Sequence, residues 1–121
     1  MKELRIVIAE DSAVLSKLIQ RALSEIEGCN VVGTAADGVE ALRLFAELKP
    51  HLLVLDISMP HKDGLEVLQE IRRTDSTTVI VMFTSDSPLR QLCLDAGANF
   101  FLDKSQLAEL KAICLTTLLA G

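Results

Sequence analysis

Short apolar runs alternate along the chain with segments in which apolar residues recur every three or four positions. The runs begin near residues 4, 30, 51, 78 and 98, and each is followed by one segment with helical periodicity. Uninterrupted short runs are typical of strands buried on both faces of a parallel sheet, and the periodic segments are typical of amphipathic helices. The pattern therefore predicts five βα units, with helices on both faces of one parallel sheet.

Local signals predict where the first two helices begin and end. The first begins near Ser12 and stops at Gly28, since glycine is a common helix terminator. The second follows the capping-box pattern at 37–40 and stops before Pro50. The residues expected on the buried side of the first helix are Val14, Leu15, Leu18, Ile19, Leu23 and Ile26.

The remaining helices have similar boundary signals. The third is expected over residues 64–73. The fourth opens with Ser87 as its cap and Pro88 at its first position, and it ends at 96–97. The fifth begins near Gln106.

No low-complexity linker, internal repeat or charge block divides the chain, so we expect one domain over residues 1–121. Right-handed crossovers allow few orders for five parallel strands, and the common one is the flavodoxin-like order 2-1-3-4-5. The predicted fold class is an α/β, flavodoxin-like (βα)5 three-layer sandwich. Strands one and three are neighbours in that order.

Composition narrows the class of protein. The chain is 50% hydrophobic, with four Phe and neither Trp nor Tyr, so the core must consist mostly of Leu, Ile, Val and Ala. The net charge of −5 argues against a nucleic-acid-binding module. Three cysteines without metal-ligand spacing predict reduced thiols of a cytoplasmic protein. Charged residues interrupt every apolar stretch, which argues against a signal peptide and against a membrane span.

Polar residues follow four of the five apolar runs. Glu10 and Asp11 follow the first, Asp56 the third, Thr84 the fourth and Lys104 the fifth. The carboxyl ends of parallel strands meet at one edge of the sheet, where ligands bind in such folds. Adjacent strands lie about 4.8 Å apart, so Asp11 and Asp56 should project into one crevice. Carboxylates this close repel one another unless a cation lies among them, which predicts a metal site.

Each of these residues also has an ordinary structural interpretation. The acidic pair at 10–11 would suit the start of a helix, where negative charge is favourable. Lys104 could be a solvated lysine, and Thr84 could cap nearby backbone. Asp56 is harder to explain in this way, because a charge directly after HLLVL is costly without a partner. All of these polar residues lie at predicted strand ends, and this shared position favours a common site.

These motifs resemble, in order and over essentially the whole chain, those of the response-regulator receiver domains of two-component signalling. A Lys-Ser pair at 104–105 is similar to receivers of the LuxR/NarL type, and stand-alone receivers are the alternative. The matching pieces are Glu10-Asp11-Ser12, Asp56-Ile57-Ser58-Met59-Pro60, Asp63-Gly64, Thr84-Ser85, Ala96-Gly97-Ala98 and Lys104.

The resemblance implies that Asp56 accepts a phosphoryl group from a sensor histidine kinase or a phosphotransfer protein, with Mg²⁺ or Mn²⁺ as the cofactor. A carboxylate can act as such a nucleophile, and a divalent cation would neutralise the incoming charge. Lys104 and Thr84 would contact the phosphoryl oxygens. The metal ligands implied are Glu10 through water, Asp11, Asp56 and the backbone carbonyl of Ser58.

The resemblance also implies an output. Phe101 and Thr84 would move together on phosphorylation and change the face made by helix four, strand five and helix five. That face would bind a second copy of the chain or a separate target, and Phe100 would be the core residue of the pair. Receivers often have Lys-Pro with a cis bond where this chain has Lys104-Ser105, so cis and trans forms are both open. The residues expected near this face are Leu89, Leu92, Phe101, Leu107 and Lys111.

Three other functions compete with this interpretation. A Mg²⁺-dependent phosphohydrolase working through an aspartyl phosphate would need a second Asp where this chain has Ser58. A flavin-binding module would need a phosphate loop, but Glu10 and Asp11 would repel a phosphate. A pseudo-receiver would lack one of the acids, and none is missing. We therefore predict a switch that catalyses only its own phosphorylation and dephosphorylation, with no binding of nucleic acid or membrane.

Overall fold

The computed structural model describes residues 2–121, and Met1 lies outside them. Every predicted βα unit is present. The strands are β1 (Leu4–Ala9), β2 (Cys29–Ala35), β3 (Leu52–Leu55), β4 (Val79–Phe83) and β5 (Phe100–Leu102). The helices are α1 (Ala13–Ser24), α2 (Gly38–Leu48), α3 (Gly64–Arg72), the 3-10 turn η1 (Ser87–Leu89), α4 (Arg90–Asp95) and α5 (Leu107–Ala120).

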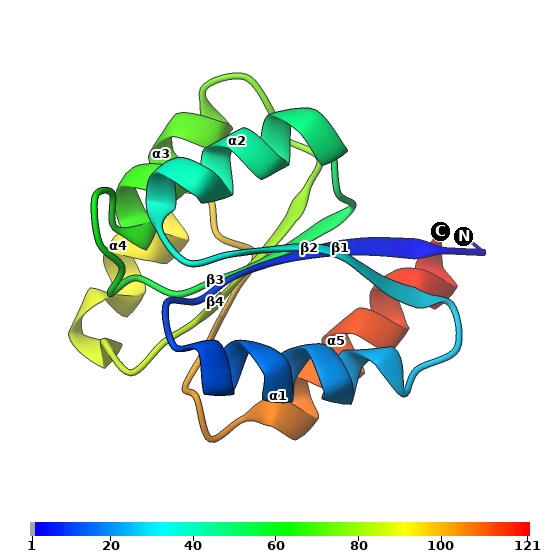
Figure 1. The fold of residues 1–121 in the computed structure, drawn as a ribbon. Coiled ribbons are helices and arrows are strands. Elements are labelled where there is room, and N and C mark those ends of the chain that lie inside the picture. Colours follow the sequence, from blue (N-terminus) through cyan, green and yellow to red (C-terminus); the bar gives the residue numbers. More distant parts are fainter. Residues whose placement is uncertain (1) are drawn as a thin grey trace.

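The five parallel strands form one sheet in the order β2-β1-β3-β4-β5, which confirms the predicted order. Helices α1 and α5 cover one face of the sheet, and α2, α3 and α4 cover the other, so the domain has three layers (Figure 1). No helix within residues 2–121 is long and apolar enough to cross a membrane.

The pairing of β1 with β3 sets the level of the residues that follow both strands. Ala9 pairs with Leu55, and the Asp56 N–H donates to the Ala9 carbonyl over 3.0 Å. The Glu10 N–H in turn donates to the Ala35 carbonyl at the end of β2 over 2.9 Å. Glu10 and Asp56 therefore leave the sheet side by side at its carboxyl edge.

The core has two parts, one on each side of the sheet. Alternate residues of β3 point to opposite sides, so Leu53 packs with α2, α3 and α4, while Leu52 and Val54 pack with α1 and α5. Both parts are largely aliphatic, as the composition predicted. A strand buried on both faces needs an uninterrupted apolar sequence, which explains why LLVL carries no polar residue.

Helix α1 is less buried than its apolar pattern predicted. Ile19 and Leu23 are buried, but Val14 is 73% exposed and Leu18 is 51% exposed. The expectation that these two residues lie in the core was wrong. A helix on a sheet buries a limited stripe, and successive positions are about 100° apart around its axis, which places Val14 and Leu18 to one side of that stripe.

Two helix boundaries also differ from the expectation. Helix α1 ends at Ser24, and Gly28, with a φ of 93°, instead shapes the turn into β2. The segment Ser87–Leu89 forms a 3-10 turn, and α4 itself starts only at Arg90. Among the described residues, no side chain caps either the 3-10 turn or α4, so the predicted cap at Ser87 does not form.

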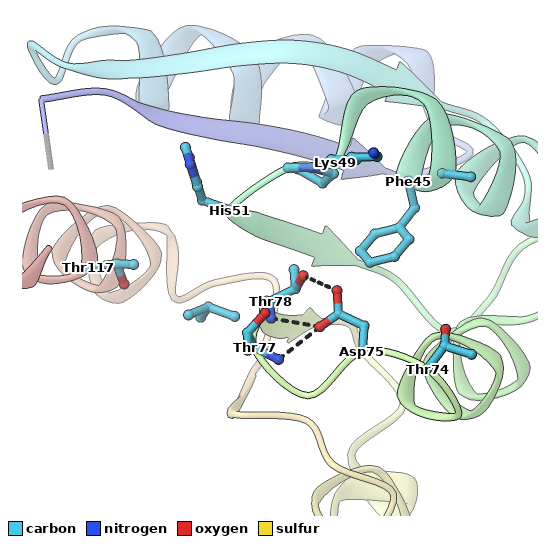
Figure 2. Close-up of a pocket in the computed structure, with 11 residues that line it drawn as sticks. Phe45, Lys49, His51, Thr74, Asp75, Thr77, Thr78 and Thr117 are labelled. Atoms are coloured by element: carbon cyan, nitrogen blue, oxygen red, sulfur yellow. Dashed lines mark hydrogen bonds between the residues drawn. The ribbon is translucent and has the colours of Figure 1, made fainter.

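A cavity of about 710 Å³ opens at the amino edge of the sheet, at the opposite end from Asp56. Figure 2 shows the Phe45 ring pointing into this cavity and the Asp75 carboxylate beside the loop that leads into β4. Asp75 accepts hydrogen bonds from the Thr77 and Thr78 N–H groups over 2.8 and 2.9 Å and from the Thr78 hydroxyl over 2.7 Å. The carboxylate thereby fixes the connection between α3 and β4.

We expect Asp75→Asn to destabilise the protein at neutral pH and to have less effect as the pH falls. Burial raises the pKa of Asp75, but hydrogen bonds from Thr78 and Thr77 outweigh it, so the pKa lies below its usual value. A carboxyl with a lower pKa in the folded chain stabilises the fold above its unfolded pKa of about 3.9. That stabilisation is lost as the pH falls through the folded pKa.

Thermal unfolding followed by circular dichroism between pH 7 and pH 3 measures this effect. The difference in Tm between wild type and Asp75→Asn should shrink across that range. Asp95→Asn, at an exposed position of α4, is the control and should show a smaller difference. A Tm difference for Asp75→Asn that stays constant with pH would contradict the prediction.

Candidate functional site

Three carboxylates meet at the carboxyl edge of β1 and β3. Glu10, Asp11 and Asp56 each place one oxygen within 4.8 Å of the others. Asp56 is only 2% exposed and Glu10 only 3%, whereas Asp11 is exposed at the rim. Two buried carboxylates side by side are electrostatically unfavourable unless positive charge is supplied.

Lys104 supplies part of that charge from the connection between β5 and α5. Its Nζ lies 2.8 Å from Asp56 Oδ2 and 3.1 Å from Glu10 Oε1, in ion pairs that lack hydrogen-bond geometry. Burial lowers the pKa of Lys104, but the two carboxylates raise it by more, so the net pKa lies above its ordinary value. One charged ammonium thus pairs with two of the three carboxylates.

Lys104 does not balance all the negative charge of the cluster, and one oxygen of the Asp56 carboxylate has no partner within residues 2–121. Asp56 Oδ1 is buried and has neither a hydrogen bond nor an ion pair within residues 2–121. Burial raises the pKa of Glu10, although the Ser12 N–H, which donates to its Oε2 over 3.0 Å, and Lys104 oppose this. A set of oxygen donors with excess negative charge matches what Mg²⁺ prefers, so these residues fit such an ion.

Two further predicted residues make no direct contact with the carboxylates. Thr84 is buried, and its hydroxyl donates to Asp86 Oδ2 over 3.4 Å and accepts the Asp86 N–H over 3.3 Å. Within the described chain, no hydrogen bond joins Thr84 to Asp56. Ser58 is exposed in the connection between β3 and α3. The structure therefore brings together Glu10, Asp11, Asp56 and Lys104, and it leaves Thr84 and Ser58 in neighbouring connections.

The start of α3 is pressed against the backbone that carries Asp56. The Gly64 N–H donates to the Ile57 carbonyl over 2.8 Å, and a Cβ at Gly64 would collide with the Asp56 carbonyl oxygen. Asp63 and Glu66 form a reciprocal capping box at this helix start. The helix end thus holds Asp56 in place through main-chain contact.

Comparison with known proteins decides the family. The model of the response regulator receiver domain matches residues 6–114. This chain is a response regulator receiver domain. The match confirms the family that the motifs indicated, and the five-stranded order confirms the flavodoxin-like fold.

The receiver is similar to parts of longer proteins and to isolated receivers. Protein-glutamate methylesterase/protein-glutamine glutaminase 5 of Myxococcus xanthus is 38% identical over 104 residues, which cover 84% of this chain but 30% of that protein. The response regulator domain of Thermotoga maritima CheB has a TM-score of 0.88 at 25% identity, with 96% of each chain covered. A LuxR-family response regulator from Aurantimonas sp. SI85-9A1 has a TM-score of 0.89 at 30% identity, covering 98% of this chain and 86% of that one.

The two phenylalanines of β5 are placed opposite to the expectation. Phe101 is 7% exposed and packs in the core part beneath α3 and α4, whereas Phe100 is 41% exposed. The expectation that Phe100 is the core residue was wrong, because β5 is an edge strand whose two faces are covered unequally. The Lys104–Ser105 bond, which the sequence left open, is trans.

Lys111 lies on a different side of α5 from the one expected. Its Nζ is 2.9 Å from Glu25 Oε1 at the end of α1. Lys111 therefore faces α1 and does not belong to the surface between α4, β5 and α5. Helical periodicity alone could not show which neighbour this side of α5 meets.

Two interactions near the receiver site were not predicted from the sequence. The capping box at Asp63 and Glu66 has the same D-G-x-E spacing as Asp37 to Glu40, so the sequence carried a signal for it. At α2 only the Asp37 half of the box forms. Arg90 contacts Phe101 from another element, and no local pattern indicates such a contact.

We expect Gly64→Ala to destabilise the receiver by about 1–3 kcal/mol, as overpacking does. Alanine at a helix position is otherwise stabilising, so the sign of the change tests the close approach to Asp56. Gly33→Ala is the control, because its Cβ would meet the flexible side-chain ends of Leu48 and Leu44 and no main-chain atom among its nearest neighbours. Urea unfolding measures both changes. Equal effects of the two substitutions would show that the backbone contact does not constrain Asp56.

Proposed function

We propose that Asp56 is the phosphoryl acceptor of this receiver, with a sensor histidine kinase or a histidine phosphotransfer protein as the donor. The observation that carries the proposal is the buried Asp56 carboxylate, which has one oxygen paired with Lys104 and one oxygen without a partner within residues 2–121. A structural aspartate this buried would be expected to have both oxygens satisfied. The comparisons match receivers, and none supports the phosphohydrolase alternative.

In the proposed reaction an Asp56 oxygen attacks the phosphorus of a phosphohistidine. The new P–O bond makes an acyl phosphate, and the P–N bond breaks with its electron pair leaving on the imidazole, which takes up a proton. Lys104 lies 2.8 Å from Asp56 and is placed to balance the charge of the arriving oxygens. Thr84 would leave Asp86 and donate to a phosphoryl oxygen.

Receivers of this family generally use Mg²⁺ at their acidic pocket, and the carboxylate cluster here suits that ion. When bound, Mg²⁺ would neutralise charge on the carboxylates and on the phosphoryl group, and Mn²⁺ could replace it. The ligands we propose are Glu10 through water, Asp11, Asp56 and the Ser58 carbonyl. Asp11 is exposed at the rim, so it can reach an ion that also touches solvent.

We propose that residues 1–121 form one receiver domain that catalyses only its own phosphorylation and dephosphorylation. The methylesterase and glutaminase activities belong by name to relatives of which this chain covers about 30%. The three cysteines are free thiols, which supports a reducing compartment such as the cytoplasm. The acidic net charge of −5 supports partners other than nucleic acid.

We expect incubation with acetyl phosphate and Mg²⁺ to add one phosphoryl group to the protein, and Asp56→Asn to abolish the addition because an amide is a poor nucleophile. Intact mass spectrometry measures the product. Asp103→Asn is the control, since Asp103 is exposed beside Lys104 and should still permit labelling. Chelator should stop labelling. Asp11→Ala should weaken Mg²⁺ binding, and so raise the Mg²⁺ concentration needed for labelling, more than Glu10→Ala. Full labelling of Asp56→Asn would end the assignment.

We also propose that the face between α4, β5 and α5 makes the phosphorylation-sensitive contact of this receiver, with a second copy or a separate target. Two large apolar residues support this proposal, because Leu92 of α4 is 55% exposed and Phe100 of β5 is 41% exposed. Thr84 and Phe101 would couple the site to this face. Thr84 follows β4, and Phe101 pairs with Met82 of that strand.

Beryllofluoride with Mg²⁺ should raise the average mass in light scattering if a second copy is the partner, and Phe100→Ala should reduce that rise. Leu115→Ala is the matched control, because Leu115 of α5 has a similar exposure of 43% and follows Lys111 by one helical turn on the α1 side. Loss of association in Leu115→Ala, but not in Phe100→Ala, would place the contact on the α1 side instead.

A further inference from the structure

The C-terminal end of α4 is firmly attached to the rest of the domain. Arg72 of α3 donates from Nε to the Gly97 carbonyl over 2.9 Å and from Nη2 to Asn99 Oδ1 over 2.9 Å and to the Thr78 carbonyl over 2.8 Å. Asn99 Oδ1 also accepts the Ile80 N–H over 2.8 Å. These bonds join the connection after α4 to both α3 and β4.

The N-terminal end of α4 has one comparable attachment. Arg90 Nη1 donates to the Phe101 carbonyl over 3.1 Å, and its guanidinium carbon lies 5.8 Å from the centre of the Phe101 ring. Within residues 2–121, no other hydrogen bond or ion pair joins the segment 85–92 to a residue more than four positions away. Leu89 adds apolar contact with the core.

Arg90 contacts both the main chain and the ring of Phe101, which is the residue expected to move on phosphorylation. Phe101 is 7% exposed, so its ring lies in the core, which we call the inward position, while Thr84 is still bonded to Asp86. The inward position therefore does not depend on a bond between Thr84 and the acidic cluster. A guanidinium over an aromatic face at an exposed site contributes about 0.5–1 kcal/mol. Arg90 can therefore shift the equilibrium between an inward and an outward position of the Phe101 ring without locking the ring in either one.

We propose that Arg90 is a positioning residue that holds the N-terminal end of α4 on Phe101 and so favours the inward position of that ring. The proposal rests on the proposed function in one respect, namely that the phosphorylated receiver favours the inward ring. A residue that raises the population of the competent conformation also tightens binding of any ligand that selects it. Removal of Arg90 should therefore weaken a phosphoryl mimic bound at Asp56, although Arg90 does not belong to the acidic cluster.

Amide hydrogen exchange of the unmodified protein tests the attachment directly. Arg90→Gln should speed exchange in residues 85–92 by about two- to five-fold, which corresponds to the strength of such a contact. Residues 93–99 should be unchanged, because Arg72 holds that end. Arg43→Gln is the matched control, since Arg43 of α2 is exposed and, among residues 2–121, its side chain pairs with Glu47 alone. Arg90→Lys retains the charge but loses the planar fork, so it should give an intermediate rate.

Beryllofluoride binding, followed by ¹⁹F NMR in Mg²⁺, tests the effect on the site. Arg90→Gln should weaken the mimic by about two- to five-fold relative to Arg43→Gln, as expected for a contact of this strength. Phe101→Ala should weaken it too. Adding Arg90→Gln to Phe101→Ala should cost less affinity than Arg90→Gln costs in wild type, because the ring contact is already gone and only the bond to the main-chain carbonyl of residue 101 remains.

The outcomes separate this proposal from the proposed function. If Arg90→Gln behaves like Arg43→Gln in exchange, Arg90 does not hold α4, and the inference is overturned. If exchange rises but mimic affinity is unchanged, the attachment exists without a positioning role, and the inference is equally overturned. If wild type neither binds the mimic nor labels Asp56, the proposed function fails, and the exchange experiment still decides whether Arg90 holds α4.

Discussion

The pairing of β1 with β3 at the centre of the sheet is the constraint on which the rest of the receiver depends. It sets Ala9 level with Leu55, so the next residues, Glu10 and Asp56, leave the sheet together. Main-chain hydrogen bonds from Glu10 and Asp56 fix the positions of both residues without any contribution from side chains. A shift of one residue in this register would turn the apolar residues of β3 to the wrong sides and separate the two carboxylates.

The electrostatics of the site oppose stability and support function. Of the three clustered carboxylates, Glu10 and Asp56 share one ammonium, and a buried Asp56 oxygen has no partner within residues 2–121, which costs folding free energy. The rest of the domain offsets this cost with aliphatic packing on both sides of the sheet. The excess negative charge favours a divalent cation, and a bound cation would then favour an incoming phosphoryl group. The same imbalance can thus serve two steps of the proposed reaction.

The attachment of α4 is uneven, and in the proposed function this unevenness would connect the site with the surface. Arg72 fixes one end of the helix to α3 and β4, while the other end depends largely on Arg90 and Leu89. A short helix held firmly at one end can move at the other at low cost. The exposed Leu92 lies in this movable part and the exposed Phe100 lies on the neighbouring strand β5, so a small movement of α4 would change the surface that a partner meets.

The order of apolar runs and the polar residues after them determined the fold, the family and the residues of the acidic cluster. A short stretch of sequence is enough to predict which strands are buried and where they end. A run such as LLVL must be covered on both faces, and the charged residue after it must lie at the edge of the sheet. Only the tertiary structure decided which phenylalanine of β5 is buried, which side of α5 carries Lys111, and that Arg90 reaches Phe101. These features depend on how helices from distant parts of the chain cover an edge strand, and periodicity within one element carries no information about that neighbour.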